Sequence, residues 1–195
     1  MVGPARLRPR ALLICLAVAL IAGGGRTQGG DAASGIPSEY QIKAAYLYYF
    51  STFVEWPPET FSRNGDALVI GVLGEDPFGD ILDNTIRGKT VNNKRLVVKR
   101  FESIKDARES HILFISASEQ GRLPNILEAL NGTTVLTVGE IGGFASRGGE
   151  IGFRMEGRKV RFDINVAAVE RSRIKVSAQL MKLGRIVKDS ESGGG

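Results

Sequence analysis

The spacing of hydrophobic and aromatic residues between positions 38 and 56 predicts an amphipathic helix. Apolar side chains recur there three and four positions apart, which places them on one side of a helix. Ser38 and Gln41 have the spacing of a capping box, and Pro57-Pro58 ends the helix near Trp56. Tyr48 falls on the side opposite the apolar stripe. The predicted buried stripe comprises Ile42, Tyr46, Tyr49, Phe53 and Trp56.

Four short apolar runs follow this helix and alternate with helical segments. The runs lie at residues 67–73, 96–101, 112–116 and 135–138, and helices are predicted at 79–87 and 122–130. Apolar strands separated by helices are typical of a parallel sheet that is covered on both faces.

The pattern changes after residue 150. Apolar and polar residues alternate over 151–155 and 160–164 around Glu156-Gly157, which predicts an antiparallel hairpin at the sheet edge. Apolar residues at 176, 180, 183 and 187 then predict a C-terminal helix. The predicted fold class is α/β: a mostly parallel central sheet flanked by helices, with an aromatic N-terminal helix and a C-terminal antiparallel hairpin.

The two ends of the chain differ from its middle. Three arginines in the first ten residues precede an apolar run over 11–22, which is typical of a cleaved signal peptide and short for a bilayer span of about 20 residues. We predict a signal peptide at 1–24, a flexible leader at 25–36, a single domain at 37–188 and a disordered tail at 189–195. Cys15 is the one cysteine, so the exported domain has no disulfide or thiol chemistry.

Much of the positive charge belongs to the predicted signal peptide. The formal net charge of +5 falls to +2 without Arg6, Arg8 and Arg10, and to +1 without Arg26. This small excess argues against a nucleic-acid-binding protein.

Aromatic residues are concentrated in the first helix. Seven of the fourteen Phe, Tyr and Trp residues lie between positions 40 and 56. Packing explains most of them, because aromatic stripes at helical spacing usually face a core. Tyr48 is the candidate for a partner or dimer contact, since Tyr and Trp are enriched at interfaces.

A glycine-rich segment, VGEIGGFASRGG at 138–149, follows the last predicted parallel strand. Its glycines lack the spacing of a dinucleotide-binding loop. Loops at the C-terminal ends of parallel strands nevertheless often bind partners. Glu140, Phe144 and Arg147 supply charges and a ring there, so both a mobile connector and a recognition loop remain open.

The sequence offers little support for catalysis. His111 is the one histidine, and no nucleophile elbow or cluster of metal-ligating residues accompanies it. We therefore predict no catalytic residue, no metal site and no cofactor. An exported hydrolase would require a polar pocket around His111.

Several segments together resemble the YfiR-like family of periplasmic regulators. They are KAAYLYYFSTFVEWP (43–57), LGEDPFG (73–79), IRGKTVNNKRLVVKRF (86–101), FASRGGEIGF (144–153) after VGE, and RFDINVAAVERSRIKVSAQLMKLGRIV (161–187). Two features depart from the family: Tyr49 stands where members often have Asn, and the cysteine pairs of some members are absent.

The resemblance implies a dimeric α/β protein that acts in the periplasm. It implies a repressor that binds the periplasmic sensory domain of an inner-membrane diguanylate cyclase and lowers cyclic di-GMP signalling, and with it biofilm formation. The alternative is a periplasmic module that binds a small, unidentified ligand in a pocket formed by the glycine-rich loop and the neighbouring strand ends.

Overall fold

The computed structural model describes residues 37–61 and 67–190. The predicted signal peptide (1–24) and leader (25–36) lie outside these ranges. The elements are α1 (Glu39–Phe53), β1 (Val54–Glu55), η1 (Pro58–Phe61), β2 (Ala67–Leu73), α2 (Asp80–Ile86), β3 (Thr90–Val91), β4 (Lys94–Phe101), α3 (Ile104–Ala107), β5 (Ile112–Ile115), η2 (Ala117–Arg122), α4 (Leu123–Leu130), β6 (Leu136–Gly139), β7 (Ile151–Glu156), β8 (Lys159–Asn165), α5 (Val166–Arg171), β9 (Lys175–Val176), α6 (Ala178–Leu183) and β10 (Arg185–Val187).

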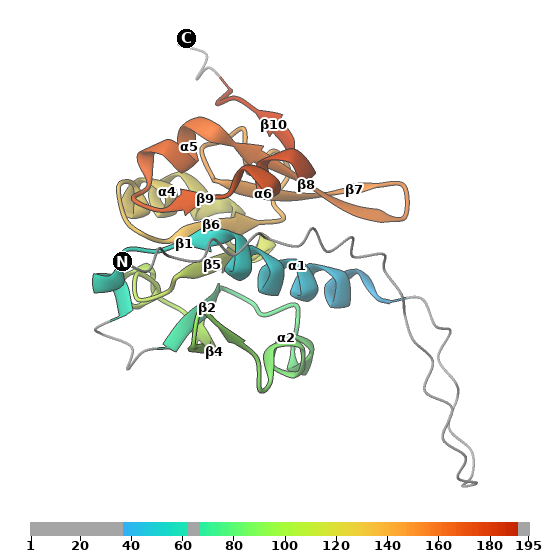
Figure 1. Ribbon diagram of the computed structural model, residues 1–195. Coiled ribbons are helices and arrows are strands. Elements are labelled where there is room, and N and C mark those ends of the chain that lie inside the picture. The colour runs from blue at the N-terminus through green and yellow to red at the C-terminus, as the bar shows by residue number, and fades with distance from the viewer. Residues whose placement is uncertain (1–36, 62–66, 191–195) are drawn as a thin grey trace, which may run out of the picture. The chain divides into compact units, whose positions relative to one another are not determined.

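The main sheet is mostly parallel, which confirms the predicted fold class. Its strand order is β10-β8-β7-β6-β5-β2-β4-β3 (Figure 1). The pairs from β4 through β2, β5 and β6 to β7 are parallel, as is β10 with β8, whereas β7–β8 and β3–β4 are antiparallel. The predicted hairpin is present, with Phe153 opposite Phe162.

Both faces of the sheet are covered by packed side chains. Successive strand residues point to opposite sides, so one strand contributes to two cores. In β5, Ile112 and Phe114 belong to the core beneath α1, whereas Leu113 and Ile115 belong to the core beneath α4. Figure 1 shows α1 between the β7–β8 hairpin and α2, and both elements contact it.

The first helix begins as predicted. Ser38 Oγ accepts a hydrogen bond from the backbone N–H of Gln41 at 3.2 Å, and the Gln41 side chain accepts one from the Ser38 N–H at 2.6 Å. This is the capping box that the sequence indicated.

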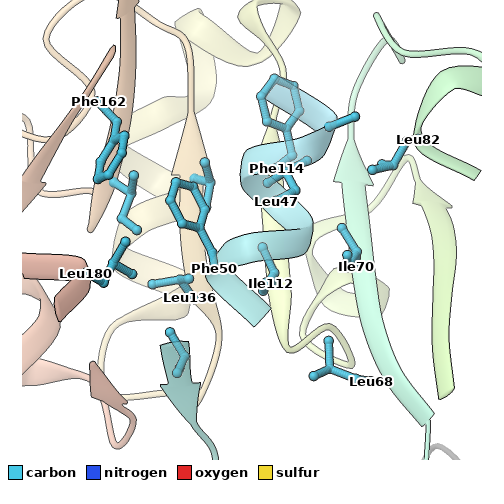
Figure 2. Packing of buried hydrophobic residues seen from close by; sticks show 14 of the residues in the cluster. Leu47, Phe50, Leu68, Ile70, Leu82, Ile112, Phe114, Leu136, Phe162 and Leu180 are labelled. Atoms are coloured by element: carbon cyan, nitrogen blue, oxygen red, sulfur yellow. The ribbon is translucent and has the colours of Figure 1, made fainter. Parts of the chain in front are cut away.

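The predicted buried stripe of α1 is confirmed only in part. Trp56 is buried, and Ile42, Tyr46 and Phe53 are half-buried and pack against the core, but Tyr49 is exposed. The fully buried residues of the helix lie on another side: Lys43, Ala44, Leu47, Phe50 and Ser51. Figure 2 shows Leu47 and Phe50 within the packed core.

Small residues explain this orientation. Ala44 and Ser51 let α1 approach the sheet, while Leu47 and Phe50 fill the space between them. The Ser51 hydroxyl donates to the carbonyl of Tyr48 within the helix, so its burial leaves no unpaired donor. The tyrosines instead lie at the margin, where their hydroxyls can stay hydrated.

The predicted C-terminal helix is present but shorter than expected. Within 176–187 only α6 is helical, and β9 and β10 flank it. Ser177 caps α6, and Gly184 ends it where a Cβ atom would lie 2.7 Å from Ile164 and 2.8 Å from Phe162. The close approach of the chain to β8 therefore requires glycine and redirects the backbone into a strand.

The described part of the chain ends at Ser190, and residues 191–195 of the predicted tail lie outside it. Asp189 accepts hydrogen bonds from Asn165 and Arg171, and the Ser190 backbone N–H donates to the carbonyl of Ser146 at 2.6 Å.

Candidate functional site

Tyr48, the predicted interface residue, is half-buried and has packing partners. The Lys89 ammonium lies 4.0 Å from the centre of its ring, and the Tyr49 ring lies 5.6 Å away. Tyr48 therefore packs at the margin of the core although it lies outside the predicted stripe, and its role in a partner or dimer contact stays a prediction. The more exposed ring is its neighbour Tyr49, at 44%.

The stripe that was expected to be buried instead forms an accessible edge of α1. We call Ile42, Tyr46, Tyr49 and Phe53 the α1 stripe. Rings behind it hold it in place, because Tyr46 lies 5.3 Å from Phe162 and 6.0 Å from Phe153 between ring centres.

Further apolar side chains lie on the elements that pack beside α1. Met155 of β7 is 46% exposed and points to the same side of its strand as Phe153. Leu183, at the end of α6, is 63% exposed, and α6 contacts α1. Exposed apolar side chains on elements that contact α1 add to the apolar surface that a protein partner could cover.

Glu140 is bound to the beginning of α1. The buried Lys43 ammonium donates hydrogen bonds to Glu39 and to Glu140, and the Tyr40 hydroxyl donates to Glu140 at 3.4 Å. Burial by itself would lower the pKa of Lys43, but its hydrogen bonds to Glu140 and Glu39 raise that pKa overall. Glu140 therefore attaches α1 to the end of β6.

Phe144 is buried, with 1% of its surface exposed, so the prediction of an accessible ring is wrong. A Cβ atom on Gly139 would lie 2.4 Å from the Phe144 ring, and one on Gly149 would lie 2.1 Å from it. These glycines let the backbone close around the ring. The glycine-rich segment is a packed loop, and of the predicted residues only Arg147 is fully exposed on it.

His111 has a structural environment. Its Nδ1 accepts a hydrogen bond from the Val69 N–H at 3.0 Å, and its ring stacks on Phe61 with ring centres 4.6 Å apart. Burial lowers the pKa of His111 to about 4, so the ring is neutral near pH 7. The described residues contain no group of three His, Cys, Asp or Glu side chains placed to hold a metal ion.

A cavity of about 210 Å³ lies beside the end of the glycine-rich loop. Thr137, Gly148 and Glu150 form one part of its wall, and Arg171 of α5 contributes another. Glu150 is buried. This burial could not be predicted from the sequence, because it depends on where β6 and β7 meet.

Comparison with known protein families shows which family this chain matches. Residues 40–185 match the model of the YfiR/HmsC-like family, from the first turn of α1 to the first residue of β10. No helix in the described ranges is long and apolar enough to cross a membrane. The match extends over about three quarters of the chain, and this protein therefore belongs to the YfiR/HmsC-like family, whose members are periplasmic regulators of diguanylate cyclase signalling.

Proposed function

We propose that this chain is a non-enzymatic periplasmic regulator that binds and represses the periplasmic sensory domain of an inner-membrane diguanylate cyclase. The family match supports the class of partner. The observation on which the proposal depends most is the α1 stripe, which presents Tyr46 and Tyr49 at the surface.

The α1 stripe has the composition of an interface centre. Aromatic side chains provide large contact areas with few rotatable bonds, and they are frequent among residues that dominate binding energy. Tyr46 is already held by the rings of Phe153 and Phe162, so little conformational freedom is left to lose on binding.

Repression requires unequal binding to two states of the cyclase. A regulator that binds active and inactive sensory domains equally well does not change their ratio. The proposed contacts are therefore stronger in the inactive state, and loss of contact at the stripe raises cyclic di-GMP.

The test compares Tyr49→Ser with Ile186→Ser. Both variants remove an exposed apolar side chain, but Ile186 lies on β10 and outside the α1 stripe. We expect deletion of the gene to raise cyclic di-GMP in the host. Wild type and Ile186→Ser restore the low level, and Tyr49→Ser does not.

Direct binding gives the second measurement. With the purified sensory domain of the cyclase, we expect Tyr49→Ser to weaken affinity roughly tenfold, as for an interface residue worth about 1.4 kcal/mol. Equal affinity and equal repression by both variants, with unchanged thermal unfolding, would contradict the proposal.

A further inference from the structure

The cavity beside Glu150 combines one buried carboxylate with an apolar wall. Its lining comes from the C-terminal end of α4, from Thr137, Gly148 and Glu150, and from the end of α5. Its volume of about 210 Å³ is below the roughly 300–1,000 Å³ of pockets for drug-sized ligands. The space therefore suits a small molecule.

Among the described residues, Thr137 bonds to only one of the two carboxylate oxygens of Glu150. Its Oε2 accepts hydrogen bonds from the Thr137 hydroxyl and from the Thr137 N–H, the latter at 2.9 Å. Oε1 accepts no hydrogen bond from another described residue. Glu150 lines the cavity, so Oε1 is the oxygen left for a ligand there.

The charge of Glu150 has little compensation. Arg171 is the one cationic side chain among the described residues of the lining, and its guanidinium pairs with Asp189 at 3.0 Å. Burial raises the pKa of Glu150 from 4.5 to about 7, and the hydrogen bonds from Thr137 oppose this increase only in part. The charge of Arg171 favours the ionised form of Glu150 but is the last and smallest of the causes that act on its pKa, and among the described contacts Arg171 donates its hydrogen bond to Asp189.

The rest of the lining indicates the chemical nature of the cation. Leu127, Leu130 and Ala168 contribute apolar contacts, and Glu128 contributes a second carboxylate. Three N–H donors on a short carbon chain match this arrangement, because the ammonium can donate to Glu150 while the chain meets the apolar wall.

We propose that this cavity binds a short alkylammonium compound, whose ammonium group pairs with Oε1 of Glu150. The site is independent of the proposed repressor surface, because the described lining contains no residue of the α1 stripe. A protein that fails to bind ammonium compounds could still repress a cyclase, so the two proposals fail separately.

Binding should be linked to protons. The charged groups around Glu150 are Arg171 on α5, Glu128 on α4 and, through Arg171, Asp189, while β6 contributes the uncharged Thr137. The ammonium binds the ionised carboxylate, so affinity increases as pH rises through about 7 and binding below that pH releases a proton.

The first experiment is calorimetric titration of the purified protein with butylammonium and, separately, with 1-butanol. We expect saturable binding of butylammonium at about pH 8, weaker binding at about pH 5.5, and none of 1-butanol, which has a similar chain but no charge. Absence of butylammonium binding up to about 10 mM would overturn the proposal.

Two glutamine variants locate the site. Glu150→Gln retains an acceptor for Thr137 and should weaken butylammonium binding at least about tenfold. Glu170→Gln removes a charge next to Arg171 but outside the cavity lining, and should leave affinity nearly unchanged. Equal affinity of wild type and Glu150→Gln would show binding elsewhere and overturn the assignment.

A measurement on the unaltered protein covers the possibility that Glu150→Gln misfolds. Carbon-13 NMR of the Glu150 carboxyl group follows its ionisation directly. We expect its pKa to fall when butylammonium is added, because a neighbouring cation favours the ionised form. An unchanged pKa at saturating butylammonium would overturn the proposal.

Discussion

Two buried titratable residues, Glu150 and His111, oppose each other in their effect on stability. Burial raises the pKa of Glu150 from 4.5 to about 7, and burial lowers the pKa of His111 from 6.5 to about 4. Both groups favour their neutral forms in the folded protein. Protonation of Glu150 therefore favours the folded state, whereas protonation of His111 disfavours it.

Replacing Glu150 separates these effects. Between pH 4.5 and about 7 the folded protein binds the Glu150 proton more tightly than the unfolded chain does, so this residue's contribution falls as pH rises through that range. Glutamine does not ionise, so Glu150→Gln does not lose stability in this way as pH rises. We expect the variant to gain roughly 1–3 kcal/mol relative to wild type between pH 5 and pH 8, measured by urea unfolding. An identical pH dependence of the two proteins would contradict this.

His111 has the reverse sign. Its contribution is fully present above pH 6.5 and is lost as pH falls toward about 4, because the unfolded chain takes up a proton that the folded protein resists. His111→Phe should reduce this acid sensitivity. It should also cost about 1–3 kcal/mol near pH 7, because the Val69 N–H loses its acceptor. Chemical unfolding across pH 4–7 tests both effects, and a variant that retains full acid sensitivity would exclude His111 as the cause.

At the scale of elements, α1 shows what a hydrophobic pattern can and cannot predict. The capping residues predicted its start, because capping depends on neighbours within one turn. The hydrophobic pattern placed the centre of the buried side wrongly. It reports where large apolar side chains recur, and it contains no information on how closely a helix can approach a sheet. Ala44 and Ser51 permit that approach. Lys43 is buried with two carboxylates, Glu39 of the same helix and Glu140 from a distant segment, and the local pattern does not show the second one.

The pair between Lys43 and Glu140 should be important for anchoring α1. Removing one member of a buried ion pair leaves the other charge uncompensated, at a cost of about 3–5 kcal/mol when both are fully buried. Glu140 and Glu39 retain some exposure, so we expect Lys43→Met to lose about 2 kcal/mol.

A double-mutant cycle checks this prediction. Lys43→Met combined with Glu140→Gln should recover part of the loss, because the unpaired carboxylate is then also removed. Simple addition of the two single effects in thermal unfolding would show that the residues do not depend on each other.

The glycine-rich loop presents a second limit of the sequence. The sequence shows that the loop follows a strand, but the burial of Phe144 depends on Gly139 and Gly149 approaching its ring from separate places in the chain. A pattern within one segment of the sequence cannot predict a contact between distant segments. Of the three residues proposed for recognition in this loop, Glu140 anchors α1, Phe144 forms the loop's core and Arg147 remains exposed.

Phe144→Ala should therefore destabilise the domain. Truncating a fully buried phenylalanine typically costs about 3–5 kcal/mol, because transfer and cavity effects add. Arg147→Ala in the same loop is the matched control, with an expected change within about 0.5 kcal/mol. Urea unfolding of both variants tests this, and similar values for the two would contradict the packing of the loop around Phe144.

At the scale of the whole domain, the sequence predicted the parallel sheet and the hairpin correctly. Those elements follow from periods of apolar residues along the chain. The pairing of β1 with β9 and the placement of β10 beside β8 were not predicted, because each joins short segments that are distant in sequence. Two- and three-residue strands carry too few side chains to show a period.

Self-association is the remaining prediction at this scale. We expect the purified protein to form a homodimer that leaves the α1 stripe free for the cyclase. Tyr49→Ser should then leave the monomer–dimer equilibrium unchanged in sedimentation experiments. A shift toward monomer in Tyr49→Ser would contradict this prediction and show that the copies meet through the stripe.

The attachment of α1 at both ends affects how a partner can fit. Glu140 holds its beginning through Lys43, and its end continues into β1, which pairs with β9 while the Ser177 N–H donates to the Phe53 carbonyl at 2.9 Å. The helix is thus held at both ends before any partner binds. In a complex at the stripe, most of the conformational entropy would consequently be lost by the partner protein.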